Sequence, residues 1–240
     1  MSASALRING LNKAYGSAVA LAGFSLEIAQ GECFGLVGEN GAGKTTLIKC
    51  ILDFCDIQAG EISIFGTPHR QTAARSRLAF LPERFTPPYY LTGRDFLRYI
   101  SGLHNLAYDE TRACAMLGSL ELDASALDRP ARAYSKGMTQ KLGLAACLLS
   151  GKDLYILDEP TSGLDPKARA LLKREIKTQH GAGRTVLMTS HALPDVAEMC
   201  GRMAVMHRGQ LRFCGTPADF IAQHGASDLE QAYLDCIADD

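Results

Sequence analysis

The sequence contains no tryptophan, and aromatic residues make up only 7% of it. It has no run of eighteen apolar residues, so no segment is expected to cross a bilayer. It also has no excess of positive charge, because 25 Lys and Arg face 26 Asp and Glu and leave a formal net charge of −1. Since nucleic-acid binding needs a basic surface, no nucleic-acid partner is expected.

The N-terminal segment and the cysteines indicate where the protein works. Asn9, Asn12 and Lys13 interrupt any early apolar stretch, so no signal peptide and a cytosolic location are expected. The eight cysteines form no C-x-x-C pair and no cluster with zinc-ligand spacing. We interpret them as buried free thiols in a reducing compartment.

The pattern of apolar segments predicts an α/β fold. With 240 residues, 47% of them hydrophobic, the chain is long enough to bury a large core. Short apolar runs bounded by Gly or Pro predict strands at 24–28, 33–37, 61–65, 78–81, 154–157, 186–189 and 203–206. Helices are expected at 43–52 and 166–179, with two short ones within 217–237. Strands that alternate with helices favour a mainly parallel sheet.

The segment from about residue 92 to 150 differs from the rest. Its apolar residues recur at helical spacing, and Ser135 is suited to cap a helix that runs to residue 149. Because this segment has little strand signal, an all-helical insertion into the α/β core is expected.

A glycine-rich segment after the second of these strands fits the pattern G-x-x-x-x-G-K-[ST] without a mismatch. Glycines let backbone N–H groups approach phosphate oxygens, and the following helix presents its positive end to the same anion. Lys44 is expected between the β- and γ-phosphates, and the Thr45 hydroxyl is expected on Mg²⁺. The predicted nucleotide-binding residues here are Gly38, Glu39, Asn40, Gly41, Ala42, Gly43, Lys44, Thr45 and Thr46.

Two adjacent carboxylates, Asp158 and Glu159, end the apolar strand at 154–157. After a phosphate-binding loop, such an Asp completes the Mg²⁺ shell. The next residue, Glu159, is placed to polarise the attacking water as a general base. Taken alone, the Asp-Glu-Pro sequence is equally consistent with a simple turn at Pro160.

A third motif, Tyr134-Ser135-Lys136-Gly137-Met138-Thr139-Gln140, is similar to the signature motif of ATP-binding cassette (ABC) transporters, which is usually Leu-Ser-Gly-Gly-Gln. With the two preceding motifs, nearly the whole chain resembles the ATP-binding subunit of that family. The resemblance implies a single domain over 1–240 with a P-loop NTPase (RecA-like) α/β core at 1–87 and 151–240. It also implies N-terminal antiparallel strands and a helical subdomain inserted at about 88–150.

Further positions match the family in order. Tyr15 resembles the aromatic residue that stacks on adenine, although it also fits an ordinary strand aromatic. The segment Ser162-Gly163-Leu164-Asp165 resembles the D-loop, which crosses the interface between two ATP-binding subunits. His191 resembles the switch histidine, a catalytic residue that contacts the γ-phosphate.

Two positions depart from the family pattern. Glu83 stands where a Gln normally follows the strand before the helical insertion, and it is hypothesised to keep a role at Mg²⁺. In the signature motif, Lys136-Gly137-Met138 replaces Gly-Gly-Gln. Both variants resemble the branch that serves ABC-2-type exporters with six-helix membrane subunits.

The resemblance implies a transport-coupled ATPase that uses ATP and Mg²⁺. Two copies are expected to form a head-to-tail dimer in which Ser135 and Gly137 contact the ATP of the partner subunit. A separate transmembrane permease is expected to hold the chain at the cytoplasmic face of the membrane. The alternatives are a soluble ABC ATPase acting on ribosomes or DNA, and a nucleotide-dependent regulator without turnover.

The loop after Glu83 has two interpretations. Its aromatic and basic residues suit a surface that docks the membrane subunit, and they equally suit an irregular loop that packs on the core. These residues are Arg84, Phe85, Pro87, Tyr89 and Tyr90.

Overall fold

The strands form two sheets in the computed structural model, which describes residues 3–238. An antiparallel sheet has the order β2 (Ala18–Ala29), β1 (Ser4–Tyr15), β4 (Ala59–Ile64) and β5 (Thr67–Pro68). A second sheet has the order β10 (Gln210–Gly215), β9 (Arg202–His207), β3 (Cys33–Val37), β8 (Thr185–Ser190), β7 (Leu154–Leu157) and β6 (Leu78–Leu81). Its strands run parallel except β10, which is antiparallel to β9. The predicted α/β fold with a mainly parallel sheet and N-terminal antiparallel strands is confirmed.

The parallel sheet separates two hydrophobic cores, and alternating residues of its central strands face each of them. On β3, Val37 faces the core formed with the later helices, and Phe34 faces the core formed with the antiparallel sheet. All residues of β3, β7 and β8 are buried, because both faces of the sheet are covered. The apolar runs that predicted these strands therefore reflect burial on two sides.

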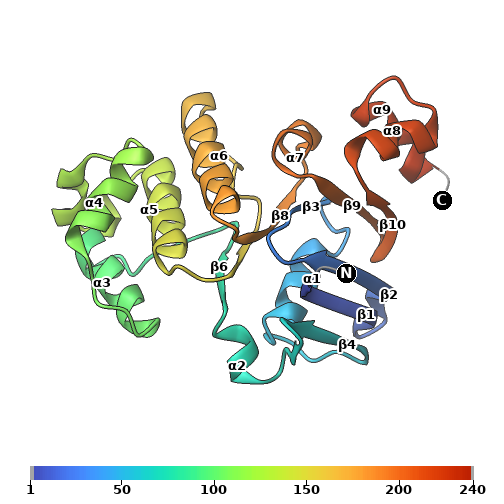
Figure 1. Cartoon of the computed structure of the whole chain (residues 1–240), viewed down its shortest axis with the longest axis horizontal. Coiled ribbons are helices and arrows are strands. Elements are labelled where there is room, and N and C mark those ends of the chain that lie inside the picture. The colour runs from blue at the N-terminus through green and yellow to red at the C-terminus, as the bar shows by residue number, and fades with distance from the viewer. Residues whose placement is uncertain (1–2, 239–240) are drawn as a thin grey trace.

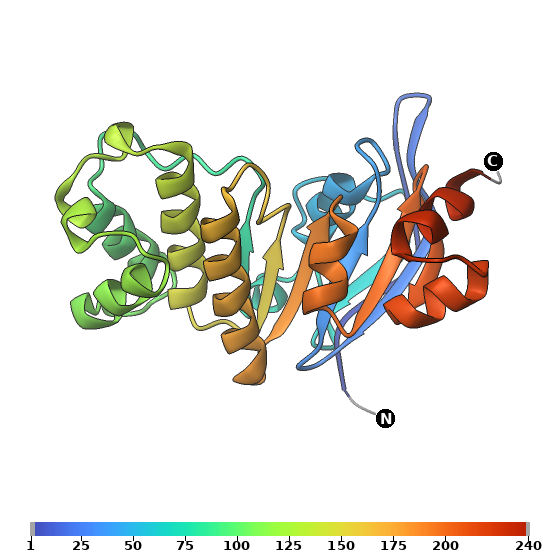
Figure 2. The same cartoon turned by 90° about the horizontal axis from the view of Figure 1, so that it is seen from above.

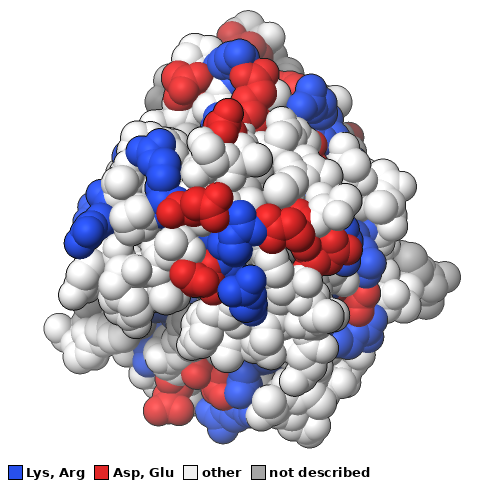
Figure 3. Space-filling view, turned by 90° about the vertical axis from the view of Figure 1, so that its left-hand side faces the viewer, with Lys and Arg blue, Asp and Glu red and all other residues white. Residues whose placement is uncertain are grey.

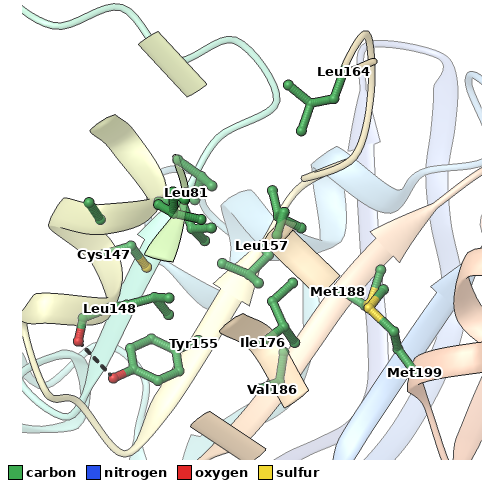
Figure 4. Close-up of a cluster of buried hydrophobic side chains, with 14 of the residues drawn as sticks. Leu81, Cys147, Leu148, Tyr155, Leu157, Leu164, Ile176, Val186, Met188 and Met199 are labelled. Atoms are coloured by element: carbon green, nitrogen blue, oxygen red, sulfur yellow. Dashed lines mark hydrogen bonds between the residues drawn. The ribbon is translucent and has the colours of Figure 1, made fainter. Parts of the chain in front are cut away.

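Helices cover both faces of this sheet (Figures 1 and 2). On one face lies α1 (Lys44–Ile51), together with the antiparallel sheet; the short α2 (Thr72–Arg75) leads into β6. On the other face lie α6 (Pro166–Gly181) and α7 (Leu193–Met199). In this second core Tyr155 donates a hydrogen bond to the Leu148 carbonyl (3.2 Å), which satisfies its buried hydroxyl (Figure 4).

The helical region, residues 92–150, follows β6 and precedes β7 in the sequence, and it lies at one end of the molecule (Figure 1). It contains α3 (Gly93–Leu103), α4 (Glu110–Ser119), the 3₁₀ turns Ala124–Asp128 and Ala131–Ala133, and α5 (Lys136–Leu149). Its residues form helices and turns, with one isolated bridge between Thr92 and Pro130. Positive and negative side chains lie side by side on the face at this end (Figure 3).

The C-terminal helices α8 (Pro217–His224) and α9 (Leu229–Ala238) lie at the opposite end, beyond β10 (Figure 1). Thr216 and Asp219 form a capping box that starts α8. Helix α9 contacts α7, which ties the tail to the second core.

Some elements and some burial differ from the sequence-based expectation. The strands β1, β5 and β10 and the short helices α2 and α7 were not assigned, because bulges in β1 and β10 break the alternation and the other three elements are short. The cysteine prediction is wrong in part. None of the eight, which all lie within residues 3–238, forms a disulfide, but Cys214 is exposed on the edge strand β10, and Cys55, Cys114 and Cys236 are half-buried. Among residues 3–238, no helix has the length and apolar character needed to cross a membrane.

Candidate functional site

The glycine-rich loop lies between β3 and α1, as its sequence predicts. Glu39, Asn40 and Gly41 are exposed, and Ala42 is buried behind them. The Ala42 carbonyl accepts a hydrogen bond from the N–H of Gly209 (2.8 Å) in the turn between β9 and β10. This hydrogen bond therefore holds the loop against the β9–β10 turn, while the tip of the loop is open to solvent.

Two glycines of the loop are required by geometry. A Cβ on Gly38 would lie 2.5 Å from the Met206 carbonyl oxygen. The loop therefore passes so close to the backbone of β9 that only glycine fits at this position. Gly43, the residue before α1, has a φ of 110°, which other residues rarely adopt. This tight turn directs the N-terminal end of α1, with its free N–H groups, toward the loop.

Lys44, the first residue of α1, is only 6% exposed. Its ammonium donates to the carbonyls of Gly38 and Glu39 and lies 3.6 Å from Glu159 Oε1. A buried cation is stable only when it is paired in this way. Phosphate oxygens bound by the loop would compete with these groups for its donors.

Asp158 and Thr45 place two oxygen ligands face to face. Thr45 Oγ1 lies 3.4 Å from Asp158 Oδ2, and Thr189 Oγ1 donates to Asp158 Oδ1 at 2.6 Å. Burial raises the pKa of Asp158, the charges of Glu159 and Glu83 raise it further, and the hydrogen bonds from Thr189 and Thr45 lower it. Hard oxygen ligands from one carboxylate and one hydroxyl fit Mg²⁺, which takes its remaining ligands from water and phosphates.

Glu159 connects the loop to His191. Its Oε2 accepts a hydrogen bond from the N–H of His191 (3.3 Å) and lies 2.7 Å from His191 Nδ1. Its Oε1 is buried and accepts no hydrogen bond from the described residues. The backbone of Glu159 has a φ of 48°, a left-handed conformation that is uncommon outside glycine and concentrates at functional sites. An acidic side chain with one oxygen that accepts no hydrogen bond, at the base of a phosphate-binding loop, can accept a proton from water.

Glu83 and Tyr15 lie at the margin of the site. Glu83 is exposed just after β6, close enough for its charge to raise the pKa of Asp158. Tyr15 ends β1, is 50% exposed, and has the Lys13 ammonium 4.7 Å from its ring centroid. A hydrogen bond with Cys55 is the largest cause that raises the pKa of Tyr15, and one with Thr46 lowers it, so the ring lies beside α1. The metal role of Glu83 and the adenine role of Tyr15 stay predictions.

Ser135 and Gly137 lie at the N-terminal end of α5 in the helical region, whereas Lys44 begins α1 and Asp158 follows β7. Ser135 caps α5 by accepting the Met138 N–H (3.2 Å), as predicted. No atom would lie within 4 Å of a Cβ on Gly137, so this helix start faces open space. The Lys136 ammonium would lie closer than van der Waals contact to a Cβ on Gly163, so the signature motif and the D-loop of the same chain lie side by side.

The loop after Glu83 divides between its two interpretations. Phe85 packs on the core, with its ring centroid 5.5 Å from that of Phe96, and Pro87 is buried. Tyr89 and Tyr90 are 67% and 68% exposed and form an edge-to-face pair. A cleft of about 620 Å³ lies between this loop and the start of α5, with Glu83, Arg84, Tyr134 and Lys136 in its lining.

Thr189 is a site residue that the sequence did not reveal. It is completely buried near the end of β8, where its hydroxyl contacts Asp158 and accepts the N–H of Glu159 (2.9 Å). The sequence offered one signal, a polar residue that ends an apolar strand two positions before His191. Only the pairing of β7 with β8 shows which residues this threonine contacts, and the sequence alone did not give that pairing.

Comparison with known protein families matches residues 21–162 to the family described as ABC transporter. This span contains the glycine-rich loop, Glu83, the signature motif and both strand-end carboxylates. It ends before His191.

Similar proteins have related descriptions. An uncharacterized ABC transporter ATP-binding protein of Synechocystis is 36% identical over 82% of this chain, which spans only 56% of that relative. The Nod factor export ATP-binding protein I of Sinorhizobium fredii is 34% identical over 95% of this chain and 68% of its own length. A solved ATP-binding subunit of an ABC transporter is 30% identical and superposes with a TM-score of 0.89 over 96% of this chain and 98% of its own.

Proposed function

The chain belongs to the ABC transporter family of ATP-binding proteins, and from this premise we propose that it hydrolyses ATP with Mg²⁺ to power export through a separate membrane subunit. The observation that carries the proposal is the position of Glu159. Its carboxylate lies between the Lys44 ammonium (3.6 Å) and His191 Nδ1 (2.7 Å). One of its oxygens is buried without a hydrogen-bond donor.

The glycine-rich loop would bind the phosphates of ATP. Its backbone N–H groups and the start of α1 supply a positive potential, and Lys44 supplies the charge between the β- and γ-phosphates. Thr45 and Asp158 would hold Mg²⁺, which neutralises charge on the phosphates when it is bound. Tyr15, half exposed beside Thr46, would stack on the adenine.

Glu159 would act as the general base in the hydrolysis. Its Oε1 would accept a proton as a water oxygen attacks the γ-phosphorus and the bond to the ADP oxygen breaks, giving ADP and phosphate. His191, 59% exposed in its side chain, would orient Glu159 through Nδ1 and contact the γ-phosphate with its other ring nitrogen.

A second copy of the chain, or a paired ATP-binding subunit, would complete each site. The open start of α5 is suited to an anion from outside the chain, since Ser135 is exposed and nothing lies near Gly137. In a head-to-tail dimer these two residues would contact the ATP bound by the partner subunit.

The membrane subunit would dock at the cleft between the Glu83 loop and α5. Exposed Tyr89 and Tyr90 offer amphipathic contact area at its margin, and Arg84 adds positive charge. The protein would then lie at the cytoplasmic face of a membrane. Export is favoured by the relatives described as Nod factor export ATP-binding proteins, which cover most of this chain.

The test is the ATPase activity and oligomeric state of Glu159→Gln with Mg²⁺. Loss of a general base is expected to lower kcat by about 10²–10⁴-fold while ATP binding remains, so the variant should accumulate as an ATP-dependent dimer. Glu175→Gln is the matched control, because Glu175 is 8% exposed but lies on α6 outside the site. Turnover of Glu159→Gln at the wild-type rate would show that Glu159 is not the base. If the wild-type protein binds ATP but does not hydrolyse it, either alone or with its membrane subunit, the result would favour the alternative of a nucleotide-dependent regulator without turnover.

A further inference from the structure

Thr189 contacts both acidic residues of the site. It lies on β8 one residue beyond Met188, which pairs with Leu157, so it stands opposite the chain as β7 ends. Its hydroxyl donates to Asp158 Oδ1 at 2.6 Å and accepts the N–H of Glu159 at 2.9 Å. Thr189 is completely buried, so solvent does not reach its hydroxyl. The two contacts just given are the polar contacts described for it.

The contact with Asp158 fixes which carboxylate oxygen is free. Oδ1 is engaged by Thr189, and Oδ2 is therefore turned toward Thr45, 3.4 Å away. A carboxylate whose one oxygen is held by a hydroxyl presents the other in a defined direction. Replacing a group that orients a metal ligand in this way typically lowers metal affinity or activity by about 10–100-fold.

The contact with Glu159 fixes a backbone that is otherwise unfavourable. Glu159 has a φ of 48°, and a non-glycine residue keeps this conformation only where its surroundings hold it. The hydrogen bond from its N–H to Thr189 Oγ1 is one such restraint. It sets the direction in which the Glu159 side chain leaves the strand, toward Lys44 and His191.

We propose that Thr189 is a positioning residue that orients Asp158 for Mg²⁺ and Glu159 for the attacking water through a single hydroxyl. The inference rests on the proposed function and adds a residue to it. The hydroxyl, rather than the size of the side chain, is what the role requires, because one O–H can donate to the carboxylate while its oxygen accepts the N–H.

The same strand supplies a control for a purely structural role. Thr185, at the other end of β8, is 1% exposed and accepts the N–H of Gly31 through its hydroxyl (3.0 Å). Replacing either threonine by valine keeps the shape and removes a buried hydroxyl. Only Thr189→Val removes a contact to the site.

The experiment compares Thr189→Val, Thr189→Ser and Thr185→Val with wild type. Binding of a fluorescent ATP analogue is titrated in EDTA and then against Mg²⁺, and kcat is measured at saturating ATP. For Thr189→Val we expect unchanged binding in EDTA, with an Mg²⁺ requirement about 10–100-fold higher and a fall in kcat of similar size. Thr189→Ser, which keeps the hydroxyl, is expected to recover most of both, and Thr185→Val to leave both at wild-type values.

The outcomes separate this inference from the proposed function. If Thr189→Val matches Thr185→Val in Mg²⁺ requirement and kcat, or if serine fails to restore them, the positioning role is wrong. If wild type binds ATP with Mg²⁺ but never hydrolyses it, the proposed function fails, and the Mg²⁺ titration still decides for or against Thr189. Should Thr189→Val not fold, Thr189→Ala is measured in its place against Thr189→Ser, with the same expected and contradicting results.

Discussion

The end of the parallel sheet and the start of α5 both carry sequence motifs, but their surroundings differ. At the sheet, Lys44, Asp158 and Glu159 are 6%, 3% and 7% exposed and contact one another or shared neighbours. At the start of α5, Ser135 is exposed and a Cβ on Gly137 would meet no atom within 4 Å. The first group is organised within one chain, and the second presents an open helix end.

Under the proposed function, this difference would separate the residues that carry out ATP hydrolysis from the residues through which a second chain controls it. Buried charges that are paired with one another are held in place by their partners, so under the proposed function the end of the sheet would supply a prearranged site for phosphate and metal. Within its own chain, the start of α5 is capped by Ser135. In the proposed dimer, this open helix end would bind an anion held by the partner subunit. Changes at the sheet should therefore affect ATP binding and chemistry, and changes at the open start of α5 should affect only the turnover that depends on assembly of two chains.

The largest effect is expected at the sheet, for Lys44→Ala. Loss of its charge should lower ATPase activity by about 10²–10³-fold and weaken ATP binding by the isolated chain. Lys49→Ala is the matched control, because Lys49 is exposed in the last turn of the same helix. Equal loss in both variants would mean that the effect comes from α1 and not from the phosphate contact. ATP titration and phosphate release measure the two properties.

At α5 the expected effect is smaller and of another kind. Gly137→Leu should fold normally and bind ATP as wild type does, because the side chain points into open space, but turnover should fall by about 10²-fold as the partner's nucleotide is displaced. Gly143→Ala, on the same helix, should lower the stability of the fold without a specific loss of turnover. Its Cβ would lie 2.6 Å from the Phe85 ring, so it should cost about 1–3 kcal/mol of folding free energy. Thermal unfolding together with ATPase activity distinguishes the two; equal loss of stability in both would contradict the account.

Glu83 lies between the two regions, and Glu83→Gln tests its effect through the pH dependence of ATP binding with Mg²⁺. The Glu83 charge contributes to the raised pKa of Asp158, so its removal should lower that pKa. Because Mg²⁺ needs the ionised carboxylate, Mg²⁺-dependent ATP binding should then persist to lower pH than in wild type. Glu61→Gln removes the same charge from β4 in the antiparallel sheet and should not shift the profile. Identical Mg²⁺ and pH dependence in Glu83→Gln and wild type would show that the carboxylate has no special role.

The smallest functional effect is expected for Tyr155→Phe in the core between the regions. It removes the buried hydrogen bond to the Leu148 carbonyl (Figure 4), so the free energy of unfolding should fall by about 1 kcal/mol. ATPase activity should be unchanged, because the hydroxyl that is removed bonds to the Leu148 carbonyl in the core and not to the proposed site. A fall in activity without a fall in stability would show that this core transmits more than support. Chemical denaturation and ATPase activity are the measurements.

The sequence predicted those parts of the molecule whose chemistry is local. The position of Lys44 after a buried strand, and of Asp158 at the end of another, follow from apolar runs and adjacent motif residues. The cap at Ser135 followed in the same way. These features depend on a few neighbouring residues and need no knowledge of the rest of the chain.

Other features depend on which segments become neighbours. Thr189 reaches Asp158 and Glu159 only because β8 pairs with β7, about thirty residues away in the chain. Strand β1 was missed because its bulges interrupt the two-residue alternation, and the exposure of Cys214 follows from its place on the edge strand β10. Neither the extent of β1 nor the exposure of Cys214 could be predicted from the residues next to them in the sequence.

The most direct test of the account is complementation between Lys44→Ala and Gly137→Leu. Each variant alone should be almost inactive, since every site in either homodimer lacks one part. In the mixed dimer one site combines an intact loop with an intact Gly137, so an equal mixture should regain about a quarter of wild-type ATPase activity if chains mix at random and sites act independently. A mixture no more active than the sum of its components would contradict the claim that the open end of α5 completes the site of a second chain.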